Sequence, residues 1–148
     1  MKFDLQNIFR NLAGAQSQVD DARTARLAVT QLLLEVARAD LNEDTAEIEA
    51  VRKYLARAYK LDAAGMDELI ASAKVRVEAS VSLYDSVKAL NGTMNADDKG
   101  QLMRGLWEVA YADGHLDPHE ESLLRRLSDL LYVPHATFIR EKLKLLGE

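Results

Sequence analysis

The sequence contains no cysteine, and two of its 148 residues are proline. Without cysteine the chain cannot form a disulfide, a thiolate metal site or a thiol nucleophile. Its longest nearly continuous apolar run, over residues 32–39, is interrupted by charged residues and is far shorter than the ~20 residues of a membrane span. The first residues also lack the apolar core of a signal peptide. We therefore expect a soluble, cytoplasmic protein.

Basic clusters and glycine-rich phosphate loops are missing as well. The chain has 19 Lys and Arg residues against 24 Asp and Glu residues, a formal net charge of −5. An acidic protein without a basic block lacks the electrostatic footprint of nucleic-acid binding. We expect no nucleic-acid partner, no bound nucleotide and no other organic cofactor. The length suits one domain with one core.

The residues that are abundant favour helices. Alanine, leucine, arginine, glutamate and lysine dominate, and no segment alternates in the manner of a half-buried strand. We predict an all-α, single-domain bundle of seven to eight helices built from two pseudo-symmetric helical hairpin repeats. The predicted helices after the N-terminal arm cover residues 20–40, 44–59, 62–78, 82–90, 96–112, a segment that starts at Pro118, and a last segment that ends at Leu146.

Several helix ends have recognisable caps. Asn95 followed by Asp98 predicts a capping box, and Pro118 after Asp117 is typical of a first helical position. The pair Asn91 and Gly92 predicts a helix C-terminus. These signals fix the predicted boundaries in the second half of the chain.

The N-terminal arm, residues 1–19, is predicted to be separate from the helical domain of residues 20–148. Its apolar residues, Phe3, Ile8, Phe9 and Leu12, have helical spacing, and a polar link follows over 14–18. Without a cationic face, a docked or frayed terminal helix is favoured over a membrane-surface helix.

The sequence also contains an internal repeat with an offset of 73 residues. Of the 25 positions in 35–59, nine are identical to those in 108–132. The matches include Glu35/Glu108, Asp40/Asp113, Asp44/Asp117 and Glu47/Glu120. Each copy shows an apolar helix, an acidic turn and a capped helix. Repeat one covers about residues 27–61 and repeat two about 99–134, and two such hairpins are expected to bury each other's apolar faces.

The pattern Ala-x-Ala-Asp, an acidic turn and a helix that opens with Glu resembles the tellurite-resistance protein B (TerB) family. The resemblance depends on residues 106–121 and on their weaker copy in 33–47, and it covers about residues 27–146. It implies an all-helical stress-response module that binds a divalent cation and is related to the N-terminal region of DnaJ-like co-chaperones. The His-Pro-Asp hallmark of J-domains is absent from this sequence. The first copy has Leu41 where glycine is usual, which predicts a different turn there.

Six carboxylates at the two turns are the candidate metal ligands: Asp40, Asp44, Glu47, Asp113, Asp117 and Glu120. Oxygen ligands suit Ca²⁺ or Mg²⁺ better than Zn²⁺. If the turns approach each other, repulsion between their charges favours cation uptake. The same acidic face would also suit a partner protein with a cationic segment.

Helix capping is the competing explanation for four of these acids. Asp44 with Glu47, and Asp117 with Glu120, have the spacing of an N-cap and a capping-box residue. Asp40 and Asp113 are instead at helix C-termini, where the helix dipole disfavours a carboxylate. Those two are therefore the stronger functional candidates.

Other conspicuous residues have structural interpretations. Glu35 is expected to pair with Arg38, and Glu108 with Arg104, with a role at the metal site as the alternative. The His115 and His119 side chains are expected at the surface, and Trp107 in the core.

We therefore predict a non-enzymatic, TerB-like module that binds a divalent cation. The first alternative is a metal-independent interaction or scaffold module that uses the same acidic face. The second alternative, a metal-dependent hydrolase, has no recognisable nucleophile to support it.

Overall fold

The computed structural model describes the backbone of residues 5–39, 45–79 and 82–147, and their side chains except those of residues 9 and 11–20. These residues form seven α-helices and no strand, which confirms the all-α prediction. The helices are α1 (Leu5–Ala37), α2 (Thr45–Tyr59), α3 (Ala63–Glu78), α4 (Leu83–Asn91), α5 (Ala96–Ala110), α6 (Pro118–Leu130) and α7 (His135–Leu146).

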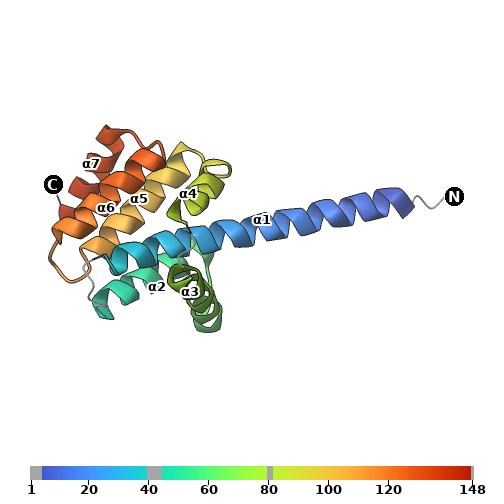
Figure 1. Cartoon of the computed structure of the whole chain (residues 1–148), viewed down its shortest axis with the longest axis horizontal. Helices are drawn as coiled ribbons and strands as arrows, with labels where there is room; N and C mark the ends of the chain where they lie inside the picture. Colours follow the sequence, from blue (N-terminus) through green and yellow to red (C-terminus); the bar gives the residue numbers. More distant parts are fainter. Residues whose placement is uncertain (1–4, 40–44, 80–81, 148) are drawn as a thin grey trace.

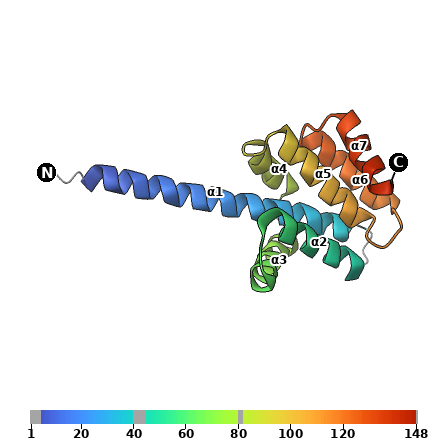
Figure 2. The same cartoon turned by 180° about the vertical axis from the view of Figure 1, so that it is seen from behind.

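Helix α1 is longer than the sequence predicted. It runs unbroken for 33 residues, so the predicted polar link over 14–18 is helical, and Asp20 and Asp21 do not open a new helix. Gly14 lies inside this helix. A glycine in a helix interior costs roughly 1 kcal/mol relative to alanine, and the remaining turns of a helix this long can offset that cost. The N-terminal part of α1 projects away from the other helices (Figures 1 and 2). At its end, Leu5 is 61% exposed and Ile8 41%.

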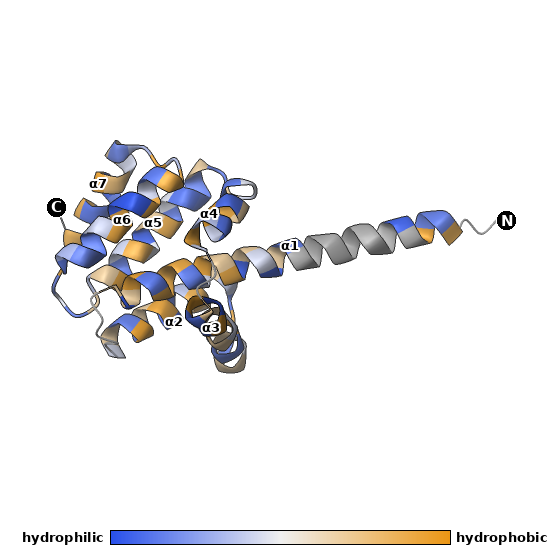
Figure 3. Cartoon of the chain, viewed as in Figure 1, coloured by the Kyte–Doolittle hydropathy of each residue, from blue (hydrophilic) through white to orange (hydrophobic). Residues whose placement is uncertain are grey.

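The C-terminal part of α1 passes through the middle of the body. Helices α2 and α3 lie on one side of it, and α4 to α7 lie on the other (Figures 1 and 2). From Ala28 to Ala37 it is buried almost all round, and Glu35 is the one residue of this stretch with appreciable exposure. The sequence of a helix that is buried on all sides has apolar residues all round, whereas a surface helix has them along one face. Figure 3 shows hydrophobic residues along this part of α1.

The two halves of the body have matching helix neighbours. In the first half α1 contacts α2 and α3, and in the second half α5 contacts α6 and α7. Helices α1 and α5 also contact each other, α2 packs against α5, and α6 packs against α1. Helix α4 connects the halves and lies against α1 and α6. Each half therefore covers apolar surface of the other.

The helix ends agree with most of the predicted caps. Asn95 and Asp98 form the predicted capping box, in which each side chain accepts a backbone N–H. Helix α4 ends at Asn91 as predicted, but Gly92 is right-handed, with φ −79°, so the left-handed cap typical of glycine is not used. Helix α5 ends at Ala110, two residues before the predicted end.

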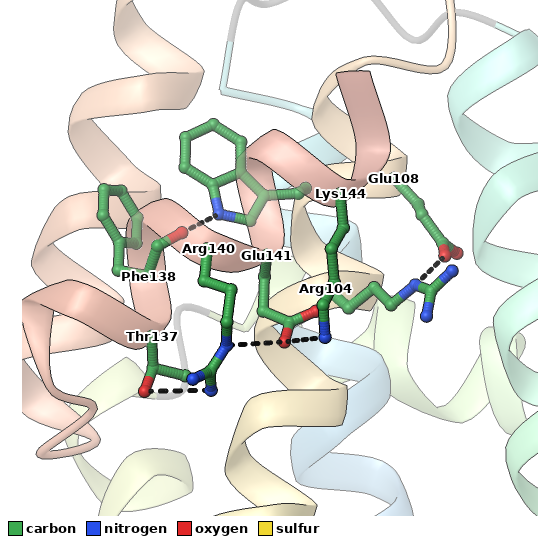
Figure 4. Close-up of polar contacts among 8 residues, drawn as sticks. Arg104, Glu108, Thr137, Phe138, Arg140, Glu141 and Lys144 are labelled. Carbon is green, nitrogen blue, oxygen red and sulfur yellow. Dashed lines mark hydrogen bonds and ion pairs between the residues drawn. The ribbon is translucent and has the colours of Figure 1, made fainter. Parts of the chain in front are cut away.

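Two contacts of α5 anchor the second half. Trp107 is fully buried, which confirms its predicted core position, and its indole N–H donates to the carbonyl oxygen of Phe138 at 3.1 Å (Figure 4). Gly105 lies against the Tyr54 ring of α2, and a Cβ there would come within 2.4 Å of that ring. The absence of a side chain at residue 105 thus allows α2 and α5 to pack closely.

None of the described helices is long and apolar enough to cross a membrane.

Candidate functional site

The second acidic turn, between α5 and α6, is held by bonds within its own backbone and side chains. Gly114 has φ 85°, the left-handed conformation that glycine adopts readily, and its N–H donates to the Tyr111 carbonyl oxygen at 2.9 Å. The Asp113 carboxylate accepts the His115 backbone N–H at 2.9 Å. Asp113 therefore has a local structural role that the sequence analysis did not assign to it.

Asp117 is the N-cap of α6. Its Oδ1 accepts the His119 backbone N–H at 2.7 Å, and Pro118 occupies the first turn as predicted. The His115 and His119 side chains are both exposed, which confirms their predicted surface positions. In the second turn, Asp113 and Asp117 thus each use one carboxylate oxygen to order the backbone, and the turn is preformed.

Glu47 and Glu120 are the unexpected members of the predicted ligand set. They occupy equivalent positions in the first turns of α2 and α6, and their exposed fractions are 0% and 1%. Burial of a carboxylate carries a large desolvation cost unless the group is paired or hydrogen-bonded. Their burial therefore distinguishes Glu47 and Glu120 from Asp113, which is exposed, and from Asp117, which is partly exposed.

The structure describes less of the first acidic turn, between α1 and α2, than of the second. Asp40, Asp44 and Leu41 lie outside the described residues, so the predicted ligand roles of the two aspartates and the predicted turn at Leu41 stay predictions. The C-terminus of α1 and the N-terminus of α2 are at the same end of the body as the α5–α6 turn (Figures 1 and 2). Within the described part of the chain, no three His, Asp or Glu side chains form a group that could hold a metal ion.

The two repeated glutamates of α1 and α5 have different surroundings. Glu108, 20% exposed, accepts from Arg57 of α2 at 3.0 Å. It also pairs with Arg104 at 3.5 Å, as Figure 4 shows. The Arg104 pair was predicted, but the pair with Arg57 was not, because a contact between residues 51 positions apart has no local sequence signal. Burial raises the pKa of the Glu35 carboxyl, and the nearby Arg38 charge partly offsets this increase.

A groove of about 550 Å³ opens beside Glu35. Its walls come from α1, α3, α4 and α6 and combine apolar with polar surface; the apolar part includes Val77, Leu83, Leu123, Leu127 and Leu130, and Tyr84 also lines the groove. Arg38 and Arg126 contribute positive charge, and Ser82 a hydroxyl group. No local pattern in the sequence indicates this groove, because its walls come from four separate helices.

The fold and the preformed turn between α5 and α6 define the class of protein: an all-helical module with an acidic turn. The family model described as "Tellurite resistance protein TerB" matches residues 26–143, most of the chain. The chain therefore belongs to the TerB family, as its resemblance implied. No curated protein and no solved structure matches the chain.

Proposed function

We propose that this protein is a non-enzymatic, tellurite-resistance-type module that binds a divalent cation, Ca²⁺ or Mg²⁺, between its two acidic turns. The first turn would supply Asp40, Asp44 and Glu47, and the second would supply Asp113, Asp117 and Glu120. The observation that carries the proposal is the burial of Glu47 and Glu120 at equivalent positions. Buried carboxylates are characteristic of ion pairs and of metal ligation.

The second turn supports this proposal through its preorganisation. Asp113 and Asp117 are each held by a backbone N–H donated to Oδ1, so binding would not have to order them. Ca²⁺ takes six to eight oxygen ligands and Mg²⁺ six, water included. The described residues alone do not form a group of three ligands. The proposal therefore requires Asp40 or Asp44 to complete the site.

Thermal unfolding in the presence of cations tests the proposal. A ligand that binds the native state alone stabilises it by about 2.7 kcal/mol at a concentration of 100 times Kd. We expect Ca²⁺ or Mg²⁺ at millimolar concentration to raise the Tm of the wild-type protein. The rise should be lost in the Asp40→Asn/Asp113→Asn double variant and in Glu120→Gln.

Glu49→Gln is the matched control, because it removes the same charge from α2 at an exposed position two residues after Glu47. Its response to cations should equal that of the wild type. An unchanged wild-type Tm in both cations would contradict metal binding and leave the interaction module that uses the same acidic face. An equal rise in all variants would show that binding occurs elsewhere.

A further inference from the structure

The groove beside Glu35 lies where the repeat places the counterpart of an arginine that pairs with Glu108. Glu108 follows Glu35 by 73 residues, and Arg57 from α2 covers it. The residue 73 positions after Arg57 is Leu130, which lines the groove that Glu35 also lines. At this place a leucine replaces the arginine that would reach the carboxylate, and the groove is open.

The difference extends to the second partner of Glu108. Arg104 follows Gln31 by 73 residues, and the Gln31 side chain is already engaged, because its Oε1 accepts from Ser86 at 2.7 Å and from Arg76 at 3.1 Å. Leu130 and Gln31, the counterparts of the two arginines that pair with Glu108, are therefore both uncharged. Glu35 remains half-buried beside a groove large enough for a ligand, within the usual range of about 300–1,000 Å³ for such sites.

We propose that the groove between α4 and α6 receives an arginine side chain of a partner protein, whose guanidinium pairs with Glu35 in the way that Arg57 pairs with Glu108. The apolar walls formed by Leu83, Leu127 and Leu130 suit the methylene stem of that side chain and apolar residues on either side of it. Glu35 supplies the complementary charge in the lining of the groove. The proposal does not depend on cation binding at the acidic turns.

Arg38 and Arg126 also line the groove, and their charges oppose the approach of a cation. The second half shows that one carboxylate in this setting accommodates two guanidinium groups at once, since Arg57 and Arg104 are 3.0 and 3.5 Å from the Glu108 carboxylate. The Arg38 charge, in the turn that follows α1, acts on Glu35. Arg126 is exposed, so its long side chain can turn towards solvent. A second guanidinium at Glu35 would therefore reproduce an arrangement that the molecule already contains.

Two short peptides provide the probe for this groove. One is acetyl-Ser-Leu-Arg-Leu-Ser-amide, and the other has citrulline, an uncharged analogue of the same shape, in place of arginine. Binding is followed in the full-length protein by NMR of the Leu83 and Leu127 methyl groups. We expect saturable shifts with the arginine peptide and at least about threefold weaker binding of the citrulline peptide, the size expected for one charge-assisted contact.

Three variants separate recognition by Glu35 from non-specific binding. Glu35→Gln should remove the preference for arginine over citrulline, and Glu108→Gln, the matched control in the second half, should retain it. Leu130→Arg should block the peptide by supplying a guanidinium from within the chain. It should also raise the Tm, and this rise should disappear when Glu35→Gln is added, a readout that holds even if no peptide binds tightly.

Equal affinity for the two peptides in the wild-type protein would overturn the proposal, as would the absence of saturable shifts. Retention of the arginine preference in Glu35→Gln would also overturn it, because the guanidinium would then be bound elsewhere. If Leu130→Arg changes the Tm equally with and without Glu35, the introduced side chain does not reach the carboxylate, and the structural equivalence on which the proposal depends is wrong.

Discussion

The two halves of this protein arrange their helices with the same neighbours but fill equivalent positions with different side chains. The second half has Trp107 where the first has Leu34, and Gly105 where the first has Leu32. Glu108 is covered by Arg57, whereas Glu35 borders an open groove. The repeat is therefore visible in the acidic residues of the sequence and in the helix neighbours of the described residues. The packing and charge between the halves differ.

The largest effect on stability is expected from Trp107, which is buried in the second half at the position where the first half has Leu34. We expect Trp107→Ala to lower the free energy of unfolding by about 3–5 kcal/mol, because it leaves a cavity beside Phe138 and removes the donor to that residue's carbonyl oxygen. Chemical denaturation followed by circular dichroism measures this. A loss below about 1 kcal/mol would show that the core does not depend on this residue, and Leu146→Ala, at a 43% exposed position, serves as the control.

The contact between Gly105 and Tyr54 should give the next largest effect. Gly105→Ala introduces a methyl group within 2.4 Å of the ring, and overpacking of this kind costs about 1–3 kcal/mol, partly offset by the better helix propensity of alanine. Tyr54→Leu brings the first half closer to the second, where Leu127 is the equivalent residue. If steric conflict is the cause, Gly105→Ala should lower the free energy of unfolding less in the Tyr54→Leu background than in the wild type. A double-mutant cycle measures this difference.

The two repeated glutamates should respond in opposite directions. Glu108→Gln removes two ion pairs with largely exposed arginines and should cost about 0.2–1 kcal/mol at pH 7. Glu35→Gln should instead stabilise the protein at pH 7. The raised pKa of Glu35 means that the folded state binds its proton more tightly than the unfolded state does, so its contribution to stability falls as the pH rises.

Below pH 4.5, the ordinary pKa of Glu35, its carboxyl group is protonated in both states, and the advantage of Glu35→Gln should disappear. Denaturation curves measured between pH 4 and pH 8 provide the check. A constant difference between Glu35→Gln and the wild type across this range would mean that the glutamate is not penalised by burial.

The smallest effect is expected from the part of α1 that has no equivalent in α5. Deletion of residues 1–20 removes the portion that projects from the body (Figure 1) and should change the free energy of unfolding by less than about 0.5 kcal/mol. Differential scanning calorimetry of the shortened chain would show this. A larger loss would indicate that the projecting segment contributes to the stability of the body.

Local signals in the sequence were sufficient for most of the fold. The starts of α5 and α6 were predicted correctly from Asn95 with Asp98 and from Asp117 with Pro118. A cap depends on residues within a few positions of each other, so it can be predicted locally. The unbroken α1 was missed because Gly14 and its polar neighbours have poor helix propensity, which is a weak guide inside a long helix. The end of α5 was predicted two residues late for a related reason, since helix ends carry less information than helix interiors.

The candidate sites were predicted less completely than the fold. Acidic residues at the two turns stand out in the repeat, but nothing in the spacing indicates that Glu47 and Glu120 are buried, because burial depends on the packing of both hairpins. The pair of Arg57 with Glu108 and the groove at Glu35 arise where separate helices meet. Such features require the relative placement of the two halves, which one sequence does not give.

The glycine beneath the Tyr54 ring also has a consequence for the two halves as building blocks. A protein assembled from two copies of the first half would place Tyr54 against Leu32, a bulky side chain, where it now meets bare backbone. Two copies of the second half would place Leu127 against Gly105 and leave unfilled space. At this contact the two halves are therefore complementary in size.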